Sequence, residues 1–117
     1  MFKKNNKKQL GFQGEQIAAT YYKKLGWKII KQNYWSRYGE LDLILQKDNH
    51  ILIVEVKTRR SYYLGYGEET ISEQKLDHIN QTYQILQQKI NLTDNYSIEI
   101  CIVELNNNYI KIRCFPV

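Results

Sequence analysis

Apolar and polar residues follow two different periods along this chain, and the first half predicts a helix followed by three strands. A helix is expected from Gln9 to the stop residue Gly26, because apolar residues recur there at helical spacing. These residues are Leu10, Ile17, Tyr21 and Leu25. Three strands are then expected at residues 27–34, 40–46 and 51–58, and a short polar turn joins the last two as a hairpin.

The second half predicts another helix and two more strands. Thr70 and Glu73 fit a T-x-x-E capping box, so this helix is expected to begin at Thr70. Its apolar face carries Ile79, Tyr83, Leu86 and Ile90. Alternation then predicts a half-buried strand at residues 98–102 and a last strand at 110–114. The order α-β-β-β-α-β-β predicts an α/β (α+β) fold with helices flanking a mixed sheet.

The length and the charge of the chain indicate the number of domains and the kind of partner. A chain of 117 residues with 43% hydrophobic residues predicts one domain, which we expect at residues 9–117 after a flexible basic arm at residues 1–8. Residues 1–31 hold eight lysines and one acidic residue, a charge of +7, whereas the remainder carries −2. Such a basic stretch indicates nucleic acid as the partner, or a tail that only aids solubility.

Neither a membrane segment nor a zinc site is expected. No stretch approaches the roughly 18 consecutive apolar residues of a membrane span, and the basic N-terminus lacks the apolar core of a signal peptide. Cys101 and Cys114, the two cysteines, lie in apolar stretches without CxxC spacing, which predicts reduced core thiols. We therefore expect a cytoplasmic protein.

Charged residues interrupt both strands of the predicted hairpin. Burying a charge costs several kcal/mol unless the charge is paired or bound to a metal. Because alternate residues of a strand share a face, Asp42 is expected beside Glu40 and Ile44. The opposite face would carry Leu41, Leu43 and Leu45. Glu55 and Lys57 share a face of the next strand, so a matching register would bring them to Asp42.

This cluster would have the chemistry of a divalent-metal site. Carboxylate oxygens suit Mg²⁺ or Mn²⁺, and a neighbouring lysine can orient a water or stabilise charge on a phosphate. Glu15 can join the cluster because its helical neighbours, Gly11, Ala18 and Ala19, are small enough for close packing. Two alternatives stay open: a structural ion pair within the cluster, and an exposed helical glutamate at Glu15.

Five short motifs occur in order along the predicted core. They are Gly14-Glu15, Asn33, Gly39–Ile44, Val54–Arg59 and Lys75. The pattern resembles the YraN family, which is similar to the PD-(D/E)XK nuclease superfamily and in particular to archaeal-type Holliday-junction resolvases. It departs from that superfamily before Asp42, where Glu40-Leu41 stands in place of a proline.

The resemblance implies a restriction-endonuclease-like core that hydrolyses phosphodiester bonds in structured or branched DNA. It implies Mg²⁺ or Mn²⁺ at Asp42 and Glu55, often with Glu15, and a catalytic lysine at Lys57. It also implies a supporting residue on the second helix, either Gln74 or Lys75.

Two more residues complete the candidate site, and other functions stay open. We expect Glu40 to support the ligands from the rim, and Arg59 to bind phosphate in a loop at residues 59–69. The tyrosines of that loop suit either unpaired bases or a packing contact. Cleavage of a symmetric junction would require two sites and hence a homodimer. The alternatives are a nucleic-acid-binding protein without turnover and a protein-interaction module.

Overall fold

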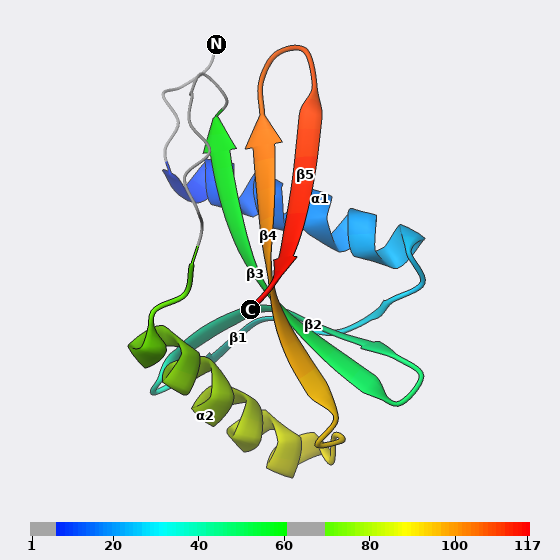
Figure 1. Cartoon of the computed structure of the whole chain (residues 1–117), viewed down its shortest axis with the longest axis vertical. Helices are drawn as coiled ribbons and strands as arrows, with labels where there is room; N and C mark the ends of the chain where they lie inside the picture. Colours follow the sequence, from blue (N-terminus) through cyan, green and yellow to red (C-terminus); the bar gives the residue numbers. More distant parts are fainter. Residues whose placement is uncertain (1–6, 61–69) are drawn as a thin grey trace.

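A mixed β-sheet with one helix on each face forms the molecule (Figure 1). The computed structural model describes residues 7–60 and 70–117, and the five strands and two helices below are those of this described part. They are α1 (Lys7–Lys24), β1 (Lys28–Ser36), β2 (Gly39–Lys47), β3 (His50–Arg60), α2 (Glu73–Ile90), β4 (Tyr96–Leu105) and β5 (Ile110–Pro116). The predicted α+β class and the order α-β-β-β-α-β-β are confirmed.

The strands lie in sequence order, β1-β2-β3-β4-β5. All neighbours pair antiparallel except β3 and β4, which are parallel because α2 returns the chain to the same end of the sheet. As an interior strand of the sheet, β4 carries buried residues on both of its faces. Its buried residues are Ile100, Cys101, Ile102 and Val103. The prediction of a half-buried strand here was therefore wrong.

Helix α1 covers one face of the sheet, and small residues make its closest contact. Ala18, Ala19 and Tyr22 are buried against apolar residues of β2, β3 and β4. Leu25, which the periodicity placed on the buried face, is 49% exposed. The predicted face residues Ile17 and Tyr21 are partly buried against this core, so the centre of the buried face lies about one residue further along than predicted.

Helix α2 covers the other face, beside β1 and β2 (Figure 1). Ile79, Tyr83 and Leu86 are buried there as predicted, whereas Ile90 at the end of the helix is 42% exposed. Neither of the two described helices is long and apolar enough to cross a membrane.

The ends of α1 follow from local chemistry. Gly26 has a φ of 98°, and the amides of Gly26 and Trp27 donate to the carbonyls of Lys23 and Tyr22. These two bonds form a Schellman motif, which confirms Gly26 as the stop. Helix α1 begins at Lys7, so Lys7 and Lys8 of the predicted arm at residues 1–8 are helical, and residues 1–6 lie outside the described part.

Two boundaries near α2 differ from the prediction. The N-cap of α2 is Ser72, whose hydroxyl accepts a hydrogen bond from the Lys75 amide at 3.1 Å, so the predicted start at Thr70 was wrong. Strand β3 continues to Arg60, so Arg59 belongs to a strand and not to a loop. The rest of the predicted loop, residues 61–69, lies outside the described part.

Candidate active site

A kink in β1 and β2 shapes the site. The pairing passes from Gln32–Leu43 to Tyr34–Leu41, and between them Asn33 lies opposite Asp42 with a φ of 52°. Asparagine tolerates this left-handed conformation better than most residues. An irregular residue inside a strand disturbs the alternation of side chains on its partner strand.

The faces of β2 show this disturbance. Leu43 and Leu45 pack on the α1 side, as expected for alternate residues. Leu41 packs with Ile44 on the α2 side. The prediction that all three leucines share a face was therefore wrong for Leu41. The change of face falls at Asp42.

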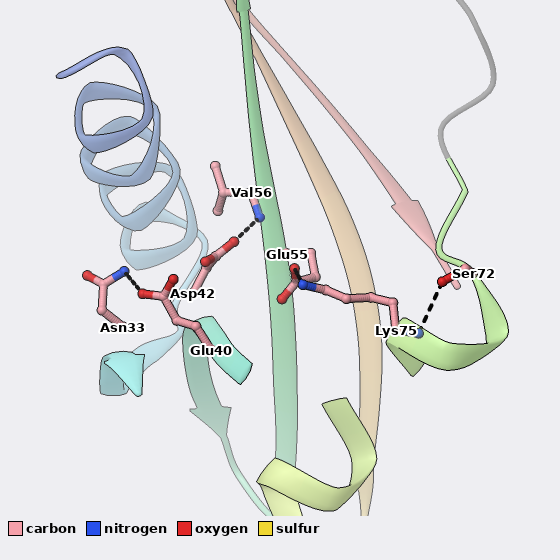
Figure 2. A network of polar contacts seen from close by, with 7 residues as sticks. All are labelled: Asn33, Glu40, Asp42, Glu55, Val56, Ser72 and Lys75. Atoms are coloured by element: carbon pink, nitrogen blue, oxygen red, sulfur yellow. Dashed lines mark hydrogen bonds and ion pairs between the residues drawn. The ribbon is translucent and has the colours of Figure 1, made fainter. Parts of the chain in front are cut away.

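The carboxylate of Asp42 points toward β3. It accepts a main-chain hydrogen bond that a neighbouring strand would otherwise accept. The β2–β3 pairing ends at Leu43–Val54, and beyond it the Val56 amide donates to Asp42 Oδ2 at 2.8 Å (Figure 2). Burial, and next the charge of Glu55, raise the pKa of Asp42 to about 7, although the hydrogen bond from Val56 acts in the opposite direction. Among the described residues, Oδ2 is the oxygen of this carboxylate that accepts a hydrogen bond, which leaves the other oxygen open to a ligand.

Glu55 is the most buried carboxylate of the group, with 7% of the residue exposed. It follows Val54 on β3, so continuing the register would pair it with Asp42. Its Oε1 lies 3.4 Å from Lys75 Nζ on α2 (Figure 2), and its Oε2 is buried without a hydrogen-bond partner. Burial raises the pKa of Glu55, and the charges of Lys75 and Lys57 oppose that rise.

Glu15 and Glu40 are held together by Asn33. Its Nδ2 donates to Glu15 Oε1 at 3.0 Å and to Glu40 Oε2 at 2.8 Å, and Figure 2 shows the Asn33–Glu40 bond beside Asp42. Both glutamates add to the rise in the pKa of Asp42, after burial and Glu55. Asn33 therefore joins α1, β1 and β2 around the carboxylate of Asp42, and Glu40 lies close enough to that carboxylate to raise its pKa.

Gly14 brings Glu15 to this place. A Cβ atom at Gly14 would lie 1.7 Å from Thr58 Oγ1 on β3, so only glycine allows α1 this close to the sheet. Gly11, which the spacing suggested as part of the small patch, has no atom within 4 Å of such a Cβ. The approach thus depends on Gly14, together with the buried Ala18 and Ala19.

The remaining predicted residues surround the pair Asp42 and Glu55 less closely. Lys57 is partly buried on β3 and acts on Glu55 through its charge. Arg59 is exposed near the end of the same strand, and Gln74 is exposed in the first turn of α2. Lys75, in the first turn of α2, forms an ion pair with Glu55 of this cluster.

Within residues 7–60 and 70–117, no three His, Cys, Asp or Glu side chains are grouped so that they could hold a metal ion. Asp42, Glu55 and Glu15 stay predicted ligands: Glu15 Oε1 accepts from Asn33, Asp42 Oδ2 accepts from the Val56 amide, and Glu55 Oε2 is buried without a hydrogen-bond partner in this part of the chain.

Sequence reasoning missed Ser72 and the amide of Val56. Ser72 caps α2 through the amide of Lys75 and so helps to place the lysine that reaches Glu55 (Figure 2). A serine two residues after Thr70 was a visible N-cap signal. No pattern in the sequence marks the Val56 amide, because its role depends on where the β2–β3 ladder ends.

Comparison with known proteins identifies the family of this chain. The model of "Uncharacterised protein family UPF0102" matches residues 14–105. A UPF0102 protein of Clostridium botulinum (strain Loch Maree) is 36% identical over 107 residues, 87% of each chain, and one of Vibrio parahaemolyticus is 33% identical over 100 residues, 84% of this chain and 83% of that protein.

A UPF0102 protein of Syntrophomonas wolfei is 46% identical over 74 residues, which are 63% of this chain and 64% of that protein, slightly under two thirds of its length. The family match includes every residue of the candidate site, from Glu15 to Lys75. The chain therefore belongs to the uncharacterised protein family UPF0102, the YraN family that its motifs resemble.

Proposed function

We propose that this protein is a metal-dependent nuclease of the PD-(D/E)XK type that hydrolyses phosphodiester bonds in structured or branched DNA. One observation carries the proposal. Two carboxylates, the buried Glu55 and the partly buried Asp42, lie within electrostatic range of each other, and Glu55 Oε2 is buried without a hydrogen-bond partner among the described residues. A buried oxygen of this kind costs free energy in a folded protein, so it calls for a ligand.

A divalent cation fits these donors. Carboxylate oxygens are hard ligands that suit Mg²⁺ or Mn²⁺. Burial raises the pKa of both Asp42 and Glu55, and the charge of Lys75, at 3.4 Å from Glu55 Oε1, opposes the rise at Glu55. The N–H and C=O groups of a strand residue point to the same side, so the Val56 carbonyl would face the site beside Asp42 as a third oxygen. Asp42, Glu55 and the Val56 carbonyl would then hold the ion.

Such an ion, when bound, lowers the pKa of a water and neutralises charge on a phosphate. The side chains of the protein supply the rest of the chemistry. Lys57 follows the ligand Glu55 by two residues on β3 and would orient the attacking water or stabilise charge on the phosphate. Lys75 is placed in the first turn of α2, where the helix dipole also favours an anion, and Arg59 and Gln74 extend this basic and polar edge.

The charge of the chain supports nucleic acid as the substrate. The net charge is +5, and residues 1–31 alone carry +7. A positive surface attracts the phosphate backbone whatever the sequence of bases. We infer a cytoplasmic location, and a homodimer if the substrate is a symmetric junction, because each of the two strands then needs a site.

A second candidate is a protein that binds nucleic acid without cleaving it. The absence of a three-residue metal group in the described part of the chain favours this alternative. In that case the role of Asp42 would be structural: its carboxylate would accept the hydrogen bond of the Val56 amide and so stabilise β3.

Cleavage assays separate the two candidates. The purified protein is incubated with four-way junctions, flaps, nicked duplexes and single strands in Mg²⁺, Mn²⁺ or EDTA. We expect cleavage with either metal, none in EDTA, and a loss of at least 100-fold in Asp42→Asn and Glu55→Gln. Asp48→Asn, an exposed residue in the β2–β3 turn, is the matched control and should keep full activity. Salt-sensitive binding without cleavage, equal in wild type and Asp42→Asn, would favour the second candidate.

A further inference from the structure

Cys101 and Cys114 face each other across β4 and β5, apart from the candidate active site. The Val117 amide donates to the Ile98 carbonyl, so this pair is a hydrogen-bonded rung of the ladder, and such rungs recur at every second pair. Cys101 and Cys114 are three residues away along each strand and hence form a non-hydrogen-bonded pair. There the Cα atoms lie about 4.5 Å apart, within the roughly 4.4–6.8 Å that a disulfide spans.

The two thiols differ in their surroundings. Cys101 is fully buried in the core under α1, whereas Cys114 is partly exposed on the edge strand β5. The Tyr22 hydroxyl lies 3.2 Å from Cys114 Sγ and 2.6 Å from Glu99 Oε1. A small reagent could therefore reach Cys114 first. Cys101 is the residue paired with it on the neighbouring strand.

We propose that Cys101 and Cys114 form a reversible cross-strand disulfide by exchange with a low-molecular-mass disulfide. Both are free thiols in the structure. The Cys114 thiolate attacks one sulfur of the reagent, expels one small thiolate and forms a mixed disulfide. The Cys101 thiol then loses its proton to solvent, attacks the Cys114 sulfur and expels the second small thiolate. Two protein thiols are thus oxidised while one small disulfide is reduced to two thiols.

The electrostatics of the pair agree with this order of attack. A hydrogen bond from the Cys101 thiol lowers the pKa of Cys114, against the effect of burial. The same hydrogen bond, with burial, raises the pKa of Cys101. The thiol with the lowered pKa forms the thiolate more readily and, because only the thiolate attacks, reacts first.

The bond would fasten the edge of the sheet. The family match ends at residue 105, where β4 ends, so β5 lies beyond the matched region. Strand β5 pairs with β4 alone among the described strands. A disulfide between Cys101 and Cys114 would close a short loop around the β4–β5 turn and hold β5 in place.

Exchange with glutathione tests the proposal. The full chain is equilibrated in mixtures of reduced and oxidised glutathione, quenched in acid, alkylated and weighed by intact mass spectrometry. We expect the oxidised wild type to lose two hydrogen masses, to carry no alkyl group and to revert with dithiothreitol. Its Tm should exceed that of the reduced protein by roughly 10 °C.

Single variants identify the order of attack. Cys101→Ser should stop at a glutathione adduct on Cys114, and Cys114→Ser should form no adduct at Cys101. Near-UV circular dichroism checks that both variants fold. Two alkylatable thiols in the oxidised wild type, or a stable adduct on Cys114 with Cys101 still reduced, would overturn the proposal.

Discussion

The carboxylate of Asp42, and not the main chain of β2, accepts the hydrogen bond of the Val56 amide, at 2.8 Å. This contact continues the sheet beyond the last β2–β3 pair, Leu43–Val54, and fixes an acidic side chain beside Glu55. The same carboxylate thus serves the fold through one oxygen and is available for chemistry through the other. Its dual position leads to the first prediction.

The stability of the metal-free protein should fall as the pH rises from about 4 to about 7. Burial, with Glu55, raises the pKa of Asp42 to about 7 in the folded chain, above the unfolded value of about 3.9. The folded state therefore binds this proton more tightly, and the stabilising effect is complete below pH 4 and lost above pH 7.

Urea denaturation at pH 5 and pH 8 in EDTA measures this effect. Asp42 should contribute a decrease of about 2–3 kcal/mol between these two pH values, which Asp42→Asn abolishes and the control Asp48→Asn keeps. An identical pH dependence in wild type and Asp42→Asn would mean that the pKa of Asp42 is ordinary.

Lys75→Met should destabilise the protein at pH 7 by about 1 kcal/mol, because Glu55 loses its counter-charge. We keep the figure small because the Lys75 side chain is 47% exposed and therefore screened by solvent. Lys89→Met, in the last turn of the same helix, is the matched control. Equal unfolding free energies for the two variants would contradict the ion pair.

Gly14→Ala should destabilise the protein by about 1–3 kcal/mol, because the new Cβ would overlap Thr58 Oγ1 and push α1 from β3. Gly11→Ala lies on the same helix with open space around it and should stabilise by about 0.5–1 kcal/mol through helix propensity. Thermal unfolding of both variants gives the comparison. A tolerated Gly14→Ala would show that the close approach of α1 is not required.

Ser72→Ala should cost about 1 kcal/mol, because the Lys75 amide loses its capping oxygen. Thr70→Ala should leave the stability within about 0.5 kcal/mol of wild type, since Thr70 lies outside α2. Chemical denaturation of the pair decides between the two caps. A larger loss for Thr70→Ala would restore the T-x-x-E box as the start of the helix.

The periodic features of the sequence predicted the order of elements, because long amphipathic helices and alternating strands carry a strong local signal. Asp42, Glu55 and Lys57 could also be named from sequence, since charges within apolar strands are rare. The start of α2 was predicted at Thr70, whereas Ser72 caps the helix in the structure.

Other features depend on contacts between distant segments and could not be predicted. The left-handed conformation of Asn33 changes the face of Leu41, and nothing in either local pattern marks it. The choice of Gly14 over Gly11 likewise depends on Thr58, 44 residues along the chain. Glu15 was predicted near Asp42, but its contact with Asn33 arises only when three elements meet.

Isothermal titration of the protein with Mn²⁺ at pH 8 tests the central claim most directly. Asp42 and Glu55 are proposed as the ligands of one divalent cation, so the wild type should bind Mn²⁺ and release heat. Asp42→Asn and Glu55→Gln should lose at least 10-fold in affinity, and the control Asp48→Asn should match the wild type. Absence of binding in the wild type, or unchanged affinity in both site variants, would contradict a metal centre at Asp42 and Glu55.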